Sequence, residues 1–153
     1  MSAGEAADVT EAGWVEAATS KHHDHVVAHV VGATVMGYFI ADDALHLLLD
    51  IGFFWIIYAD GEMGLVAEST TVAELNVSDE MRASIREETN ALRRADAGAQ
   101  GLSILSVAPA GCLIEEVRFY CRGAWRRLLI RGEAASLSVE GSVETGEIAI
   151  SEL

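Results

Sequence analysis

Branched and aromatic residues occur along this chain in short runs that are separated by glycine and aspartate. The runs cover residues 25–40, 44–50, 53–59 and 64–69 in the first half, and 103–108, 112–121, 125–131, 135–140 and 147–151 in the second. β-branched and aromatic residues favour strands, and an Asp-Gly pair such as Asp60-Gly61 favours a tight hairpin turn. The pattern therefore predicts antiparallel β meanders.

Two segments have a helical pattern instead. Residues 10–20 are rich in alanine and glutamate, and Thr10 is a suitable N-cap. Residues 79–95 follow Ser78, begin with two acids and have Arg93 and Arg94 near their end, as the helix dipole favours. We predict a short helix over residues 10–20 and a longer one over residues 79–95.

These elements indicate an α+β fold in which two or three helices pack on antiparallel meanders. The 153 residues suffice for one compact domain, residues 1–153. A shift of 81 residues places Tyr38 over Phe119, which suggests an internal duplication of residues 10–70 and 79–152, each a helix with four strands. The alternative is that two meanders share the same alternation by coincidence.

The chain is strongly acidic, with 24 Asp and Glu against 10 Lys and Arg, so its formal net charge is −14. All nine arginines lie between Arg82 and Arg131; against seven acids they give residues 79–131 a charge of +2, and the other segments hold the excess acid. Affinity for nucleic acid rests on basic side chains that displace counterions from phosphates. The charge therefore argues against a nucleic-acid partner.

The sequence gives no indication of export or of a membrane span. Its start lacks the basic and apolar parts of a secretory signal, and two cysteines, Cys112 and Cys121, are too few for a disulfide scaffold. The apolar runs at 26–41 and 44–59 are shorter than the roughly 20 residues of a spanning helix and contain ionisable residues. We predict a cytoplasmic protein without a membrane segment.

Four of the five histidines fall within eight residues, which suggests a metal site. Imidazole and carboxylate groups suit Zn²⁺ or another divalent ion, and His25 and His29 share one face in a helix or in a strand. The candidate ligands are His22, Asp24, His25 and His29, with His46 as a ligand from elsewhere in the chain. The alternative is a polar junction between two elements in which these histidines are solvated or hydrogen-bonded. A divalent metal is thus the only cofactor that the sequence suggests, and the sequence does not firmly imply that a metal binds.

An arginine and aromatic group lies further along the chain, between Arg118 and Arg131. If residues 121–124 close a hairpin, Arg118 lies opposite Arg127, and Tyr120 and Trp125 pair on the same face. These four residues are candidates for binding a small anion. The alternative is that the arginines are neutralised within the molecule by Glu115, Glu116 and Glu133.

The run from Phe53 to Tyr58 has bulky side chains on both faces of one predicted strand. An exposed strand of this kind invites aggregation, so it must be covered by the rest of the chain or by a second copy. A homodimer through this strand is therefore one hypothesis.

Function follows only weakly from these features. The GxSxG, GxGxxG and P-loop signatures are absent, so hydrolases, dehydrogenases and NTPases with those motifs are not favoured. The leading hypothesis is a non-catalytic acidic binding or regulatory protein that engages a basic protein partner, as an inhibitor or escort would. The alternatives are a metal-binding protein or metal-dependent enzyme centred on residues 22–29, and a small-anion sensor at residues 118–131.

Overall fold

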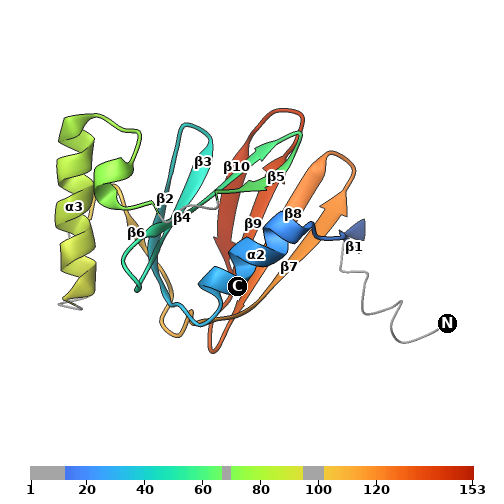
Figure 1. Cartoon of the computed structure of the whole chain (residues 1–153), viewed down its shortest axis with the longest axis horizontal. Helices are drawn as coiled ribbons and strands as arrows, with labels where there is room; N and C mark the ends of the chain where they lie inside the picture. Colours follow the sequence, from blue (N-terminus) through green and yellow to red (C-terminus); the bar gives the residue numbers. More distant parts are fainter. Residues whose placement is uncertain (1–12, 67–69, 95–101) are drawn as a thin grey trace.

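Two five-stranded antiparallel sheets pack face to face in this protein, and a helix covers the outer face of one of them (Figure 1). The computed structural model describes residues 13–66, 70–94 and 102–153. Over these residues the strand order is β5-β4-β3-β2-β6 in the first sheet and β1-β7-β8-β9-β10 in the second. In the part of the chain that the structure describes, the fold is mostly sheet with two α-helices, which confirms the α+β prediction with antiparallel meanders.

The elements have the following bounds. The first sheet consists of β2 (Val35–Ala41), β3 (Ala44–Leu49), β4 (Phe54–Asp60), β5 (Glu62–Leu65) and β6 (Ser106–Val107). The second consists of β1 (Val15–Glu16), β7 (Ile114–Arg122), β8 (Trp125–Gly132), β9 (Leu137–Ser142) and β10 (Ile148–Glu152). The helices are α2 (Lys21–Val30) and α3 (Asp79–Arg93), with a 3₁₀ turn at Val72–Glu74.

Each sheet is built around one meander of four consecutive strands, β2 to β5 and β7 to β10. With the shift of 81 residues, β2, β3 and β4 overlap β7, β8 and β9, and the turn at Asp42-Asp43 falls on the turn at Gly123-Ala124. Two independent meanders would give the same strand order, so the internal duplication stays a hypothesis.

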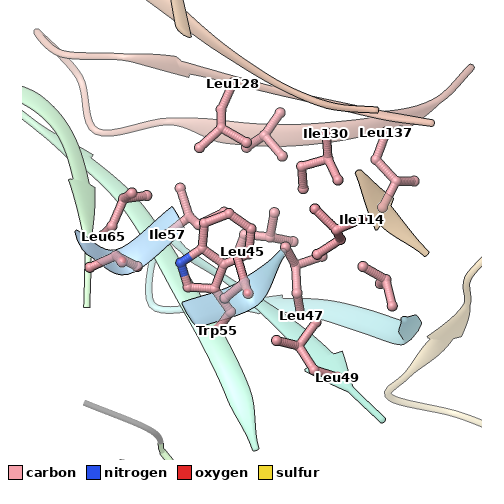
Figure 2. Packing of buried hydrophobic residues seen from close by; sticks show 14 of the residues in the cluster. Leu45, Leu47, Leu49, Trp55, Ile57, Leu65, Ile114, Leu128, Ile130 and Leu137 are labelled. Atoms are coloured by element: carbon pink, nitrogen blue, oxygen red, sulfur yellow. The ribbon is translucent and has the colours of Figure 1, made fainter. Parts of the chain in front are cut away.

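The main core lies between the two sheets. Leu45, Leu47 and Leu49 alternate along β3 and, with Trp55 and Ile57 of β4, point toward the second sheet (Figure 2). Facing them are the fully buried side chains Ile114, Leu128, Ile130 and Leu137. Full burial of one such side chain is worth about 1.5–3 kcal/mol, so this interface is the main source of the fold's stability.

A second core lies between the first sheet and α3. Ser78 caps the helix, since its Oγ accepts from the N–H of Met81 at 3.1 Å, and Ile85 and Leu92 pack against Phe39 and Leu48 of the sheet. The predicted helix over residues 79–95 is thus confirmed from Asp79 to Arg93. The alternation of residues along β3 by itself predicts that His46 and Leu48 face solvent. This prediction is wrong, because α3 and the turn before it cover that face of the sheet and bury both side chains.

The helix predicted over residues 10–20 is wrong for the part that the structure describes. Val15 and Glu16 pair with β7 as strand β1, and the helix begins instead at Lys21, where the side chain of Ser20 accepts from the N–H of His23. Residues 25–30, which the sequence predicts as strand, belong to this helix α2. Val26 and Val30 lie one turn apart and are buried in the main core, so tertiary packing outweighs the preference of valine for strands. Residues 10–12 lie outside the described residues.

The bulky strand predicted at residues 53–58 is β4, which has β3 on one side and β5 on the other. Its side chains Phe54, Trp55 and Ile57 are fully buried by the two cores of the same chain. No second copy is needed to cover them. Neither of the two described helices is both long and apolar enough to cross a membrane.

Candidate functional site

A cleft of about 740 Å³ lies beside helix α2, and we call it the α2 cleft. Its walls come from β1, the start of α2, the hairpin of β4 and β5, and the turn region of β7 and β8. It brings together members of two residue sets that the sequence keeps apart, namely His22 from the metal candidates and Tyr120 and Arg127 from the anion candidates.

Two histidines at the start of α2 bind the outer edge of strand β5. The Nε2 atom of His22 lies 2.8 Å from the carbonyl oxygen of Leu65, and the Nε2 atom of His23 lies 2.9 Å from that of Met63. A carbonyl oxygen only accepts, so Nε2 carries the hydrogen in both rings. The ring of His23 also stacks on Phe119 at 4.8 Å. These two histidines therefore hold α2 against the edge of the sheet.

The other candidate metal ligands are in different surroundings. His25 and His29 are both exposed, with ring centroids 4.7 Å apart. Asp24 accepts a hydrogen bond from Thr19 at 2.6 Å. His46 is buried on the other side of the first sheet, where its ring stacks on Phe39 and burial lowers its pKa. Over the described ranges, no group of three or more His, Cys, Asp or Glu side chains is placed to hold a metal ion.

The arginine group makes ion pairs within the molecule. Arg118 pairs with Glu116 at 3.0 Å and with Glu16 at 3.5 Å. Arg127 donates to Glu140 at 2.8 Å, and its guanidinium lies 4.5 Å from the ring centre of the buried Trp14. Arg131 also pairs with Glu116, at 3.2 Å.

Across the two sheets, Arg126 donates to Glu62 at 2.6 Å, and this hydrogen bond holds the pKa of that carboxyl below its usual range. The sequence suggested neutralisation of the arginines by Glu115, Glu116 and Glu133. Of these three glutamates, only Glu116 forms an ion pair with an arginine. The other carboxylates that pair with Arg118, Arg126 and Arg127 are Glu16, Glu62 and Glu140, which lie on strands β1, β5 and β9.

The predicted pairing of this hairpin was wrong by two residues. Arg118 lies opposite Leu129, Tyr120 opposite Arg127, and Arg122 opposite Trp125, because the two-residue turn is Gly123-Ala124 with Gly123 at φ +59°. A slip of two residues leaves every side chain on its face. Arg118, Tyr120, Trp125 and Arg127 therefore share one face, as predicted.

A smaller hollow of about 430 Å³ adjoins the α2 cleft and shares Tyr58 and Asp60 with it; we call it the Tyr58 groove. It lies where the turns after β2, β4 and β9 meet, and its lining includes four exposed carboxylates: Asp42, Asp43, Asp60 and Glu144. No Lys or Arg lines it, and none of the four forms an ion pair with a described residue.

Tyr58 is 39% exposed at the junction of these two hollows. Its ring lies over Gly64 on the neighbouring strand, where a Cβ atom would clash with the ring, so the close approach requires glycine. Asp42 and Asp43 both have positive φ values, 51° and 57°, which β-turns of type I′ require and which aspartate tolerates better than most residues. The contact with Gly64 therefore places the Tyr58 ring, and the turn places the backbone of Asp42 and Asp43.

Sequence reasoning missed the residues of the Tyr58 groove as a group. Asp42-Asp43 and Asp60-Gly61 are typical of turns by sequence, and nothing in the sequence connects Glu144 with them. A signal was available in two consecutive aspartates at a hairpin position where Asn-Gly is the usual choice. Comparison of the chain with protein-family models, curated proteins and solved structures finds no match.

Proposed function

We propose that this protein is a non-catalytic binding protein whose Tyr58 groove receives a basic segment of a partner protein. The observation that carries the proposal is the concentration of four exposed carboxylates in one hollow that no Lys or Arg lines. Arg118, Arg126, Arg127 and Arg131 provide no counter-charge there, because each pairs with a carboxylate outside the groove.

Charge supports fast, selective encounter with a cationic partner. Each exposed carboxylate adds only about 0–1 kcal/mol when it pairs with one Lys or Arg. Four carboxylates in a chain with a net charge of −14 together attract cations and steer a basic surface toward the groove. At physiological salt the attraction reaches about 8 Å, so contact with the groove itself is required for binding.

Tyr58 supplies the apolar part of the proposed site. A half-exposed aromatic ring surrounded by carboxylates can stack with an incoming guanidinium or ammonium group, an interaction worth about 0.5–1 kcal/mol at an exposed site. The adjacent α2 cleft adds Phe119, Tyr120 and the apolar edge of β5, which provides room for neighbouring residues of the partner.

The test compares two variants of equal net charge. In the groove variant, Asp42→Asn, Asp43→Asn, Asp60→Asn and Glu144→Gln remove four charges and preserve the turns, because asparagine also tolerates positive φ. In the control variant, the exposed residues Glu80, Glu87, Glu115 and Glu133 are changed to glutamine. Binding of a labelled twelve-residue Lys-Arg peptide is followed by fluorescence anisotropy at several salt concentrations.

The proposal predicts that the groove variant loses most of its affinity for the peptide, whereas the control variant stays close to the wild type. Equal weakening in both variants would mean that the peptide responds only to net charge, and the groove would then have no special role. The anion-sensor alternative predicts the opposite preference, namely binding of phosphate or carboxylate compounds that is lost in Arg127→Ala.

A further inference from the structure

The exposed face of helix α2 presents two histidines one helical turn apart. His25 and His29 have ring centroids separated by 4.7 Å, with an angle of 79° between the ring planes. We infer that this pair is a chelating site for a divalent transition-metal ion such as Ni²⁺, Cu²⁺ or Zn²⁺. The inference goes beyond the proposed function, because neither residue lines the Tyr58 groove.

The spacing suits two nitrogens on one ion. Metal–nitrogen bonds of about 2.0–2.1 Å place the nitrogens roughly 3 Å apart when they subtend a right angle. Side chains at i and i+4 lie above one another on a helix, and rings as close as these reach that separation by rotation about their side-chain bonds. The chelate therefore requires no change in the helix backbone.

The backbone of α2, which carries His25 and His29, is held in place by other residues of the same helix. Val26 and Val30, which directly follow the two histidines and lie about 100° away around α2, are buried in the main core, and Ser20 caps the start of the helix. His22 and His23 fix its first turn to the edge of β5. Because the helix is already ordered, binding a metal incurs no cost of folding the site.

These two rings are also free to bind, unlike the other histidines. His22 and His23 are engaged by carbonyl oxygens and His46 is buried, whereas neither His25 nor His29 forms a hydrogen bond with any residue that the structure describes. A metal ion would displace only water from them. The net charge of −14 also raises the local concentration of cations around the molecule.

Ligand type decides which ions fit. Two neutral imidazoles suit Cu²⁺, Ni²⁺ and Zn²⁺, whereas Mg²⁺ and Ca²⁺ prefer oxygen ligands. Among the described residues no third His, Cys, Asp or Glu joins the pair, so water or an external ligand would fill the remaining coordination positions. The site is thus an open one, accessible from solvent.

Calorimetric titration of the whole chain with NiCl₂ tests the inference, with MgCl₂ as the ion that should not bind. We expect one Ni²⁺ per chain and an upward shift of the melting temperature, since the ion binds the folded state. His25→Ala and His29→Ala should each weaken binding by more than about tenfold, because even outer-shell partners are worth 10–100-fold in metal affinity.

A double variant, His25→Ala with Val31→His, is the matched control. It retains five histidines but places two of them two residues apart at the end of the helix, where their side chains do not face each other. All the altered positions are exposed, so circular dichroism should show an unchanged fold. Loss of Ni²⁺ binding in this variant supports the chelate. Binding equal to the wild type, or no binding of Ni²⁺ to the wild type, would overturn the inference.

Discussion

Glu88 of α3 is a buried carboxylate whose removal should destabilise the protein strongly. Its two oxygens accept from the backbone N–H groups of Ser103, Ile104 and Leu105 at distances between 2.8 and 3.2 Å, and from the Ser103 hydroxyl at 3.0 Å. The carboxylate thus binds the segment before β6 to the helix and places Leu105 in the second core.

The magnitude follows from which donors lose their partner. A hydrogen bond to a charged group contributes about 1.5–3 kcal/mol to the free energy of unfolding. A buried donor that loses its acceptor cannot bond to water instead, so the protein loses this contribution. Leu105 is buried, Ile104 is half-buried, and Ser103 is exposed enough for water to replace the carboxylate. Glu88→Ala should therefore lower the free energy of unfolding by about 3–4 kcal/mol. Glu88→Gln, which keeps one acceptor oxygen, should lower it by about 1–2 kcal/mol.

The effect should depend on pH with a definite sign. Burial alone would raise the pKa of Glu88, but hydrogen bonds from Leu105, Ser103 and Ile104 outweigh it, and the pKa is lowered. A lowered folded-state pKa gives stability that is present above the unfolded value of about 4.3 and is lost as the pH falls through the folded value. The difference between wild type and Glu88→Gln should hence shrink in acid.

Urea unfolding followed by tryptophan fluorescence at pH 7 and in acid measures these quantities. The neighbouring exposed residue Glu87 provides the control, because Glu87→Gln should change the free energy of unfolding by less than about 0.5 kcal/mol. A Glu88→Ala protein as stable as the control would refute the reasoning. A difference between wild type and Glu88→Gln that is independent of pH would refute the electrostatic part.

Four further predictions concern separate parts of the molecule. Leu47→Ala, in the fully buried centre of the main core, should cost about 2–5 kcal/mol in denaturant unfolding, and a cost below 1 kcal/mol would contradict the packing described. Gly132→Ala should cost about 1–3 kcal/mol in the same assay, because the new Cβ would clash with the carbonyl oxygen of Ala135. Arg126→Met should raise the pKa of Glu62 toward its ordinary value in an NMR titration, and an unchanged pKa would show that the pair does not form in solution. Burial lowers the pKa of His46, so its contribution to the free energy of unfolding is present above the unfolded-state pKa of about 6.5 and is lost as the pH falls through the folded-state pKa. His46→Gln should lack this loss when unfolding is measured between about pH 8 and pH 5.

The sequence predicts an element correctly where residues at its own ends mark its start or its end. Ser78 and the acids after it mark the start of α3, and the glycines and aspartates between the meander strands mark most turns within two residues. The strands β3, β4, β7, β8 and β9 follow from alternation and from β-branched residues. These elements need little tertiary context to form.

The region before β2 could not be predicted in this way, because tertiary contacts decide it. Valines 26, 27, 30 and 31 favour a strand, yet the segment is helical and buries Val26 and Val30 in the main core. Trp14 falls within residues 10–20, where the sequence predicts a helix, but it lies under Arg122 and Arg127 on the outer face of the second sheet. Both placements depend on strands about a hundred residues away.

The acidic character that the sequence shows as a bulk property acquires a location through strand topology. Residues 25–78 contain no Lys or Arg, and they contribute Asp42, Asp43 and Asp60 from two turns at the same end of the first sheet. The second meander adds Glu144 at that end. Arg126, from the net-positive residues 79–131, pairs instead with Glu62 in the α2 cleft. Because alternate turns of a meander lie at the same end, acids far apart in sequence meet in one groove, whereas Arg118, Arg126, Arg127 and Arg131 pair with carboxylates outside it. A basic partner would therefore encounter the Tyr58 groove as a site that is locally acidic.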